Sequence, residues 1–541
     1  MSNAYFNVPQ PRNEPIKQYA PGSPERASLK TRLAEMAAEK IEIPLIIGGK
    51  EIYTGDTDTC IMPHDHKHVL ATYHRASEEH VEMAIEAAYQ AWLKWSEMPW
   101  QDRAAIFLKM ADLLQGPYRD TINAATMLGQ SKTAFQAEID SACELIDFFR
   151  FNVKYMTDIY KDQPDSAAGM WNRSEYRALE GFIFAITPFN FTSIAGNLPT
   201  APALMGNVSL WKPSHTSVFS GYYLMKLFEE AGLPAGVINF VPGPSPKVAK
   251  VAIESPSFAG IHFTGSTGVF QRIWNTIGTN ISNYKSYPRI VGETGGKDFI
   301  FAHESTDADS LAVAILRGAF EYQGQKCSAA SRVYVPTNLW PDVKARLVAD
   351  LETVKVGDVC DFSNFMGAVI NDKAYNKISG YIQTAKESSE TKIISGGGCS
   401  DEKGYFIEPT VIETSNPKYE TMVDEIFGPV VTVYPYDPED FEETLTLCDE
   451  TSPYALTGAI FGRDRYVLNH MVKRLRHAAG NFYINDKPTG AVVGQQPFGG
   501  GRASGTNDKA GSALNLLKWV NPRTIKETFV PPVDYRYPYM D

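Results

Sequence analysis

The sequence predicts an α/β protein with at least two units, each built around a parallel sheet that is covered by helices. The chain has 541 residues, which exceeds the size at which a single hydrophobic core stops growing. From Gly181 onward, short apolar runs alternate with helical segments, a pattern typical of parallel strands joined by crossover helices. A second set of the same kind runs from Ala308 to about Asn485, which predicts another α/β unit.

The composition argues against several classes of partner. The six cysteines form no CxxC pair and have no regular spacing, which indicates a reducing compartment and no structural metal. The formal net charge of −12 is spread along the chain without acidic or basic blocks. Neither nucleic acid nor an anionic membrane is therefore the expected partner, and we expect a small-molecule substrate instead.

Two segments bear on location. Residues 181–211 contain no Asp, Glu, Lys or Arg and are long enough to cross a bilayer, but Pro188, Pro199 and Pro202 interrupt them. We expect a buried strand, loop and helix there. The N-terminal residues resemble neither a secretory signal nor a transit peptide. The expected location is the cytoplasm, if the protein is bacterial, or the mitochondrial matrix, if it is a processed eukaryotic protein.

Two helical segments precede the first alternating set. Residues 77–114 and 133–159 have helical periodicity, and the second segment is apolar on two sides, so it is expected to be buried. One stripe contains Phe135, Ile139, Ala142, Ile146, Phe149 and Val153, and the other contains Glu144, Phe148, Phe151 and Tyr155. Glu144 lies among aromatic rings, where an ionised carboxylate needs a cation. Both a functional cation and a structural Arg or Lys satisfy this requirement.

The first alternating set contains five expected strands. They span 182–186, 208–211, 237–241, 260–264 and 289–291, and helical segments between them include 218–231 and 246–253. Two further segments, 161–180 and 519–541, are polar, aromatic and proline-containing, and they belong to neither core. We interpret them as strands exchanged between subunits, with plain surface segments as the alternative.

Cys327 and Glu293 form a candidate catalytic pair. Glu293 precedes Cys327 by 34 positions, and a thiol with a carboxylate base is suited to covalent chemistry at a carbonyl. The alternative is that Cys327 is a small buried hydrophobe. Asn190 follows an apolar run, so its carboxamide needs an acceptor. An oxyanion held by Asn190 and the Cys327 N–H would gain about 3–4 kcal/mol per donor; helix capping is the alternative role for Asn190.

Several turns are candidates for binding a nucleotide, because the carboxyl ends of parallel strands collect ligands. Lys212 and Ser214 follow the second expected strand, where a ribose would lie. Gly265 and Ser266 follow the fourth strand and open a helix whose N–H groups suit pyrophosphate. The chain has no GxGxxG motif at these turns, and an ordinary N-cap is the alternative for Ser266. Further on, Glu425 and Phe427 are placed to hold a ribose and shield a ring.

Six motifs taken together resemble the aldehyde dehydrogenase superfamily in order and spacing, over about residues 40–525. They are Thr187-Pro188-Phe189-Asn190, Lys212-Pro213-Ser214, Phe263-Thr264-Gly265-Ser266, Glu293-Thr294-Gly295-Gly296-Lys297, Gly324-Gln325-Lys326-Cys327 and Glu425-Ile426-Phe427-Gly428-Pro429. The resemblance implies a Rossmann-type NAD-binding domain, an α/β catalytic domain and a small β oligomerisation flap.

The resemblance also implies domain limits. The N-terminal extension is expected at 1–40, the NAD-binding domain at 41–160 and 181–300 with part of 490–518, and the catalytic domain at 301–489. The flap is expected to combine 161–180 with 519–541. Such a flap implies a homodimer or a higher homo-oligomer.

Within the superfamily, the chain is most similar to the Δ1-pyrroline-5-carboxylate dehydrogenases. The segments that carry this similarity are 137–140, 144–150, 324–329, 481–486 and 494–500. By that similarity, Gly490 and Ala491 hold the substrate α-carboxylate through backbone N–H groups, and Ser328 assists them. Some members have Ser at the position of Ala491, a mild departure for a backbone anchor. Glu144 would face the α-ammonium. Phe191 and Phe498 would contact the aliphatic stem of the substrate.

The implied reaction is the NAD-dependent oxidation of L-glutamate γ-semialdehyde to L-glutamate, the second step of proline catabolism. Cys327 would form a thiohemiacetal and then a thioester, and Glu293, which also borders the nicotinamide, would activate the hydrolytic water. Ser214 is not preceded or followed at this turn by an acidic residue, so the choice between NAD and NADP stays open. The alternatives are a dehydrogenase of another ω-semialdehyde, a thiol esterase, or an inactive scaffold.

Overall fold

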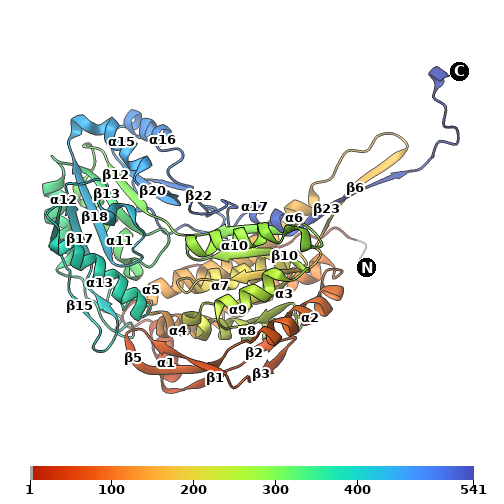
Figure 1. Ribbon diagram of the computed structural model, residues 1–541, viewed down its shortest axis with the longest axis horizontal. Helices are drawn as coiled ribbons and strands as arrows, with labels where there is room; N and C mark the ends of the chain where they lie inside the picture. The colour runs from red at the N-terminus through yellow and green to blue at the C-terminus, as the bar shows by residue number, and fades with distance from the viewer. Residues whose placement is uncertain (1–3, 541) are drawn as a thin grey trace.

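The computed structural model describes residues 4–540 and contains two lobes, each with a seven-stranded sheet (Figure 1). The first sheet has the order β11-β10-β7-β8-β9-β2-β3. Its parallel strands are β7 (Phe182–Ile186), β8 (Val208–Lys212), β9 (Ile238–Phe240), β10 (Phe258–Thr264) and β11 (Arg289–Glu293). The five predicted strands and their parallel arrangement are confirmed.

An antiparallel hairpin extends this sheet beyond the prediction. It consists of β2 (Leu45–Ile47) and β3 (Lys50–Ile52), and β2 pairs with β9. Strands of three residues are too short to produce a periodic pattern, which explains why the sequence did not reveal them.

Helices connect the parallel strands of the first lobe. They are α7 (Thr192–Leu204), α8 (Val218–Ala231), α9 (Ser245–Glu254) and α10 (Thr267–Thr279). The predicted segments 218–231 and 246–253 are confirmed as α8 and α9. The uncharged stretch 181–211 is strand β7, a loop, α7 and strand β8, as expected. None of the helices formed by residues 4–540 combines the length and apolar character needed to cross a membrane.

The N-terminal part adds helices and a small sheet to the first lobe. The helices are α1 (Pro24–Ala38), α2 (Glu78–Trp95), α3 (Trp100–Gln115) and α4 (Arg119–Gln130), and the sheet contains β1 (Ile41–Ile43), β4 (Thr57–Met62) and β5 (Asp65–His74). The single helical segment expected at 77–114 is wrong, because Pro99 separates α2 from α3. Proline disfavours helical backbone in the residue before it and lacks an N–H.

The helix expected at 133–159 is also interrupted. It consists of α5 (Ala134–Ala137), a π-helical turn η1 (Glu138–Cys143) and α6 (Glu144–Lys161). A π turn inserts extra residues into the helical repeat, so the side chains before and after it do not follow one straight stripe. Phe135 was expected in the buried stripe, but it is 36% exposed and borders a pocket.

The second lobe has a sheet of order β14-β17-β18-β13-β12-β20-β21, in which only β14 is antiparallel to its neighbour. The strands are β12 (Asp298–Ala302), β13 (Ala330–Pro336), β14 (Thr391–Ser395), β17 (Thr410–Thr414), β18 (Val430–Tyr436), β20 (Thr457–Phe461) and β21 (Asn481–Ile484). The covering helices are α11 (Ala308–Phe320), α12 (Trp340–Leu351), α13 (Asp372–Glu387), α15 (Phe441–Glu450) and α16 (Arg465–Arg474). The second α/β unit is confirmed.

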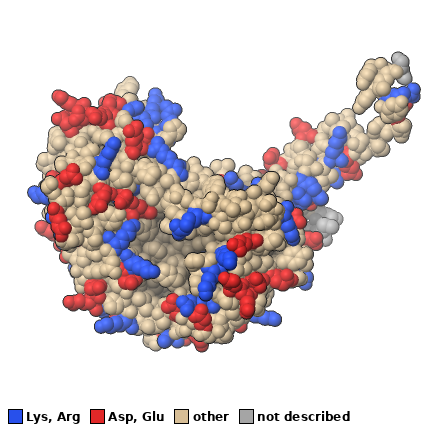
Figure 2. Space-filling model, in the orientation of Figure 1, with Lys and Arg blue, Asp and Glu red and all other residues tan. Residues whose placement is uncertain are grey.

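A two-stranded ribbon projects from the first lobe (Figure 1). It pairs β6 (Met170–Arg177) with β23 (Asn521–Thr528) in antiparallel register. The two polar segments expected outside both cores therefore contain strands, and their exchange between subunits remains a prediction, as do the domain limits. Figure 2 shows acidic and basic side chains interspersed on one face, with a hollow between the lobes.

Candidate active site

The ends of four strands bring the predicted nucleotide and catalytic residues to one edge of the first sheet. In the register of the sheet, Ile186 pairs with Lys212 and with Phe263, and Thr264 pairs with Glu293. The loops that follow these strands therefore start side by side. This edge faces the loop of the second lobe that carries Cys327, because the thiol reaches Glu293.

Cys327 and Glu293 are in contact. The Cys327 Sγ donates a hydrogen bond to Glu293 Oε1 over 3.6 Å, and the thiol side chain is buried. Cys327 follows the short turn η4 (Glu321–Gly324), in which Tyr322 and Gln323 have φ of 51° and 54°. Few side chains adopt this left-handed backbone, so the turn before the thiol is held by its surroundings. The Gln323 side chain, for example, donates to two buried carbonyls.

The protonation of this pair suits proton transfer. Burial raises the pKa of Glu293 to about 7, although the Cys327 hydrogen bond lowers it. Burial also raises the pKa of the Cys327 thiol well above its usual range, and the nearby Glu293 carboxylate raises it further. The thiol is therefore protonated in this arrangement and hydrogen-bonded to a base with a pKa near neutral pH, the range in which general bases work best.

Asn190 lies in the loop between β7 and α7, beside the cysteine turn. Its Nδ2 donates to the Gln325 carbonyl over 3.0 Å, and its side chain is buried. The N-cap position of α7 is Phe191, and no side chain caps that helix, so the capping alternative for Asn190 is wrong. A carboxamide has two N–H bonds, and residues 4–540 offer no acceptor for the second one.

Lys212, Ser214, Gly265 and Ser266 follow two neighbouring strand ends. Lys212 is buried, burial lowers the pKa of its ammonium to about 8, and no carboxylate in the described chain forms an ion pair with it. The Ser214 hydroxyl lies 3.1 Å from that of Thr216. Ser266 occupies the N-cap position of α10 without accepting a capping bond, so the ordinary side-chain cap is not formed. The first N–H groups of α10 therefore lack a side-chain partner there.

Glu425 and Phe427 approach this edge from the second lobe. Glu425 Oε1 accepts a hydrogen bond from the Gly296 N–H over 3.0 Å, and a Cβ on Gly295 would overlap the carboxylate. Glycine is therefore required next to Glu425, whose pKa burial raises. Phe427 has φ of 62°, and its ring packs edge-to-face on the ring of Phe189, with 5.9 Å between the ring centroids.

All the predicted substrate residues line one pocket together with Cys327. They are Glu144, Phe191, Ser328, Gly490, Ala491 and Phe498. A smaller adjoining pocket contains Glu293 and shares Glu144 and Phe498 with the first. The nucleophile, the base and the predicted substrate residues thus border two pockets that share lining residues, although they come from five separate stretches of the chain.

Glu144 has no cationic partner in the chain. The Ser193 hydroxyl donates to its Oε2 over 2.6 Å, and among residues 4–540 no Lys or Arg forms an ion pair with it. A structural Arg or Lys partner is therefore not what holds this carboxylate. Burial raises the pKa of Glu144 to about 8, and Asp140 raises it further. A ligand that carries a positive charge would favour the ionised form.

The loop that contains Gly490 offers further polar groups. Gly490 has φ of 92°, a conformation that favours glycine, and the Ser328 hydroxyl lies 2.8 Å from that of Thr489. The Lys487 Nζ donates to the Thr489 carbonyl over 3.2 Å, and Lys487 lines the pocket. Sequence reasoning missed Lys487, although its place just after the end of strand β21 was a usable signal.

The N-terminal segment closes part of the pocket, which the sequence did not reveal. Asn13 Nδ2 donates to Asp147 Oδ2 over 2.7 Å and to the Val493 carbonyl over 2.8 Å. Glu14 forms ion pairs with Arg119 at 2.6 Å and with Arg150 at 2.8 Å. These contacts join positions more than 100 residues apart, so periodicity and spacing cannot show them.

A buried charge network supports the aromatic wall of the pocket. The Lys132 ammonium lies 4.2 Å from the centre of the Phe191 ring and forms an ion pair with Asp140 at 2.6 Å. Lys326, which precedes the thiol, approaches Asp140 to 3.4 Å. Sequence reasoning missed this network, because Lys326 is more than 180 residues away from Lys132 and Asp140 along the chain.

Comparisons with known proteins identify the family. The chain matches the aldehyde dehydrogenase family over residues 53–525. It is 54% identical over 540 residues to the mitochondrial delta-1-pyrroline-5-carboxylate dehydrogenase of Dictyostelium discoideum, covering 99% of this chain and 97% of that one. The human mitochondrial enzyme of the same name is 48% identical over 529 residues, covering 98% and 94%.

Solved structures give the same picture. The Delta-pyrroline-5-carboxylate dehydrogenase of Mycobacterium tuberculosis bound with NAD has a TM-score of 0.96 and 51% identity, with both chains covered completely. The 1-pyrroline-5-carboxylate dehydrogenase from Thermus with bound NAD has a TM-score of 0.91 and 33% identity, with coverage of 97% and 100%. The chain therefore belongs to the aldehyde dehydrogenase family.

Proposed function

We propose that the protein is an NAD-dependent dehydrogenase that oxidises L-glutamate γ-semialdehyde to L-glutamate, the second step of proline catabolism. The substrate is the open-chain aldehyde formed when Δ1-pyrroline-5-carboxylate hydrolyses. The observation that carries the proposal is the pocket in which Cys327 and the unpaired carboxylate of Glu144 both lie. The relatives and the NAD-bound structures support the same substrate and cofactor.

Glu144 and the 487–491 loop match the two charges of an α-amino acid. The Glu144 carboxylate accepts the α-ammonium, a charge-assisted contact in a pocket that is also lined by aromatic rings. The N–H groups of Gly490 and Ala491 and the Ser328 hydroxyl hold the α-carboxylate, and we add Lys487 as a cation near that end. The aliphatic stem lies between two aromatic rings, those of Phe191 and Phe498.

The first chemical step uses the Cys327–Glu293 pair. Glu293 takes the thiol proton, and the thiolate then forms a bond to the aldehyde carbon while the carbonyl electron pair moves to oxygen. The free N–H of Asn190 and the backbone N–H of Cys327 stabilise that oxyanion. NAD, when bound, supplies the hydride acceptor for this family of reactions.

The second step releases the product. After loss of hydride, the substrate is held as a thioester on Cys327. Glu293 first releases the thiol proton to solvent and then removes a proton from water. The hydroxide attacks the thioester carbon, and the C–S bond breaks to give the acid, which ionises to glutamate, and a thiolate that takes the proton from Glu293. A base with a pKa near 7 is suited to both proton transfers.

The residues present fit a dinucleotide. Lys212 is a buried cation without a carboxylate partner, and the N-terminus of α10 at Gly265 and Ser266 lacks a side-chain cap. These groups would hold anionic and hydroxyl groups of the cofactor, with Ser214 and Glu425 at riboses and Phe427 against a ring. Ser214 follows Pro213 where an acidic residue would favour NAD over NADP, so both cofactors belong in the assay.

The proposal is tested by steady-state assays with Δ1-pyrroline-5-carboxylate, succinate semialdehyde and propanal, each with NAD and with NADP. We expect the highest kcat/KM for Δ1-pyrroline-5-carboxylate with NAD. Cys327→Ala should abolish NADH formation while calorimetry still detects NAD binding. A preference for succinate semialdehyde, which lacks an α-ammonium, or hydrolysis of activated esters without NADH formation would contradict it.

We further propose that the protein is a homo-oligomer that exchanges the β6–β23 ribbon between subunits, with the domain limits expected above. The ribbon projects away from the body of its own chain, which supports this assignment (Figure 1). The named relatives of eukaryotes are labelled mitochondrial, so the matrix is the proposed location in a eukaryote and the cytoplasm in a bacterium. Light scattering of a variant that lacks residues 521–541 would test the assembly, since an unchanged mass would contradict it.

A further inference from the structure

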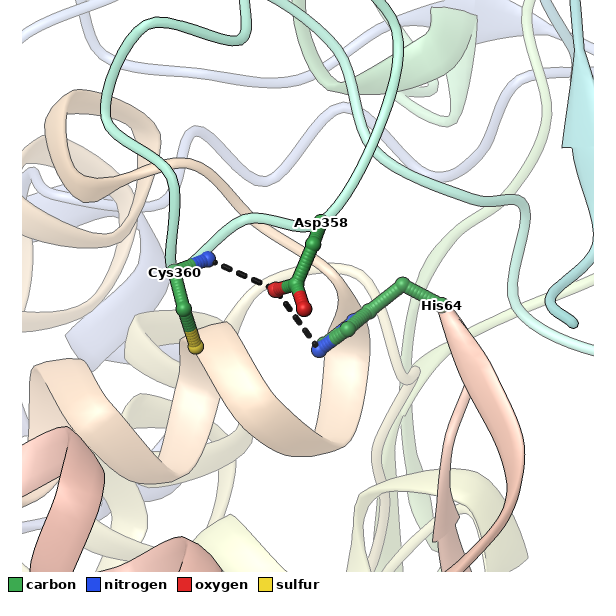
Figure 3. Close-up of side chains that lie close together, drawn as sticks. All are labelled: His64, Asp358 and Cys360. Carbon is green, nitrogen blue, oxygen red and sulfur yellow. Dashed lines mark hydrogen bonds and ion pairs between the residues drawn. The ribbon is translucent and has the colours of Figure 1, made fainter.

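Three side chains with metal-ligating atoms meet at a place that the reaction does not use. They are His64, Asp358 and Cys360 (Figure 3). His64 lies in the turn between β4 and β5, whereas Asp358 and Cys360 lie in the loop between α12 and α13 of the other lobe. One ligand atom from each lies within 4.8 Å of the other two. From the spacing of the cysteines we predicted no structural metal. Spacing along the chain cannot reveal a cluster whose members come from positions this far apart in the sequence.

His64 points an unpartnered nitrogen into this cluster. Its side chain is 1% exposed, its Nδ1 lies 3.2 Å from the Ser131 hydroxyl, and its Nε2 has no hydrogen-bond partner among the described residues. The Asp358 Oδ1 is 3.6 Å from Nε2, which is too long for a hydrogen bond. Buried polar atoms usually have partners, so this nitrogen indicates a missing one.

The His64 ring is buried and its Nε2 lies 3.6 Å from Asp358 Oδ1, beyond hydrogen-bond length, so no partner in the chain compensates a charge on the ring. A neutral imidazole with a free lone pair is the form that binds metals. A hydrogen bond from Nδ1 to the Ser131 hydroxyl would place that lone pair on Nε2 and orient the ring, as outer partners of metal-bound histidines do.

One of the three separations has the length found around a tetrahedral ion, and the thiol lies within 4.8 Å of the other two ligand atoms. Bond lengths of about 2.0 Å to nitrogen and oxygen and about 2.3 Å to sulfur separate the ligand atoms by about 3.3–3.6 Å. The distance of 3.6 Å between His64 Nε2 and Asp358 Oδ1 has this length. The Cys360 N–H donates to the same Oδ1 over 2.9 Å, so the carboxylate and the thiol are held on one tight turn.

The backbone around His64 is also fixed. The Tyr405 N–H donates to the Pro63 carbonyl over 3.0 Å, and a Cβ on Gly404 would overlap the His64 backbone. On the other side, Val359 is buried in the core of the first lobe, which anchors the loop between its two ligands. The three ligands are therefore presented by segments that cannot move apart freely.

We propose that His64 Nε2, Asp358 Oδ1 and Cys360 Sγ form a site for one Zn²⁺ ion, with water as the fourth ligand. One nitrogen, one oxygen and one sulfur are a donor set typical of zinc. The Cys360 thiol gives up its proton to solvent when the ion binds, so the thiolate and the Asp358 carboxylate balance the two positive charges.

Such an ion would link the two lobes, and it would be connected through Ser131 to η4, the turn that precedes Cys327. Ser131, the partner of His64, accepts from the Ala368 N–H over 2.9 Å and offers its carbonyl to the Gln323 side chain, also at 2.9 Å. Gln323 belongs to the turn that precedes Cys327. The ion is therefore expected to stabilise this turn without taking part in the reaction.

The test measures metal content. Full-length protein is treated with chelator, incubated with one equivalent of Zn²⁺, passed over a sizing column and analysed by mass spectrometry for zinc. We expect one zinc per chain in the unaltered protein, in Cys327→Ala and in Cys399→Ser, which removes an exposed thiol elsewhere. Cys360→Ala and His64→Asn should lose it, and Ser131→Ala should weaken binding about 10- to 100-fold.

Two further readouts identify the ligands. Cobalt(II) in place of zinc should give a thiolate-to-metal absorption band that Cys360→Ser lacks. Because one proton is released, the apparent affinity should rise about tenfold per pH unit. Zinc retained in Cys360→Ala, zinc lost in Cys327→Ala, or no zinc retained by the unaltered protein would each overturn the proposal.

Discussion

Glu293 and Glu144 are two half-buried carboxylates that border the same pocket but differ in their partners. Burial is the largest cause that raises the pKa of each, to about 7 for Glu293 and to about 8 for Glu144. Glu293 is in contact with a protonated thiol that belongs to the chain. Glu144 accepts only the Ser193 hydroxyl and has no cation beside it in an ion pair.

The difference shows that a carboxylate with a raised pKa can serve either proton transfer or ligand recognition, depending on its partner. A half-buried carboxylate with a proton donor from its own chain, as at Glu293, is ready to transfer protons. A half-buried carboxylate without a cation, as at Glu144, gains most when a ligand brings the missing charge. Substitutions that remove one carboxylate at a time should therefore separate chemistry from recognition.

The largest effect is expected from Glu293→Gln. Gln keeps the shape but cannot accept a proton, so kcat should fall about 10²- to 10⁴-fold. The fall should be similar for Δ1-pyrroline-5-carboxylate and propanal, because the base acts on both. In the unaltered enzyme, kcat/KM for propanal should rise with pH up to about 7 and then level, since Glu293 must be ionised. A loss confined to one substrate would contradict the role of general base.

Glu144→Gln should instead reduce activity on only one of the two substrates. Removing the charge while keeping the shape costs one charge-assisted contact, so kcat/KM for Δ1-pyrroline-5-carboxylate should fall about 10- to 100-fold. Activity on propanal should stay within about twofold of its original value. That substrate has no ammonium, so it loses no contact when Glu144 is replaced. Parallel losses on both substrates, measured by the same steady-state assay, would remove Glu144 from recognition.

Lys487→Met should have a smaller effect on the same comparison. The ammonium acts at the carboxylate end of the substrate beside backbone donors, so its loss should raise KM for Δ1-pyrroline-5-carboxylate about fivefold. Lys487→Arg should retain much of the affinity, and propanal kinetics should not change. Lys392→Met, at an exposed site, is the charge-matched control. An equal rise in KM for the control variant would attribute the effect to net charge.

The sequence predicted the first lobe well for a physical reason. Its central strands are buried on both faces, as in β10, where all seven residues are buried, and such strands appear as uninterrupted apolar runs. The β2–β3 hairpin lacks that signal because its strands are short. The π turn η1 was equally invisible, since helical periodicity continues on both sides of it.

The candidate site was predicted unevenly for a related reason. Residues that follow strand ends, such as Lys212 and Glu293, are marked by their position in the α/β pattern. The contact of Lys132 with the Phe191 ring and that of Asn13 with Asp147 depend on how distant segments pack. No local pattern encodes such contacts, so only the three-dimensional arrangement reveals them.

The last expected effect concerns stability, not catalysis, and isolates Glu144 from every substrate. Its pKa is about 8 in the folded protein and 4.5 without burial, so between these values the folded state holds a proton that the unfolded chain has released. The free energy of unfolding should therefore fall as pH rises in that window, by at most about 1.4 kcal/mol per pH unit from this group. Gln cannot ionise, so denaturant unfolding of Glu144→Gln should show an advantage over the unaltered protein that grows from pH 5 to pH 8. Glu402→Gln, at an exposed carboxylate, should show no such trend. If the two curves for Glu144→Gln and the unaltered protein ran parallel, the carboxylate would already have a partner in the free enzyme, and its contrast with Glu293 would disappear.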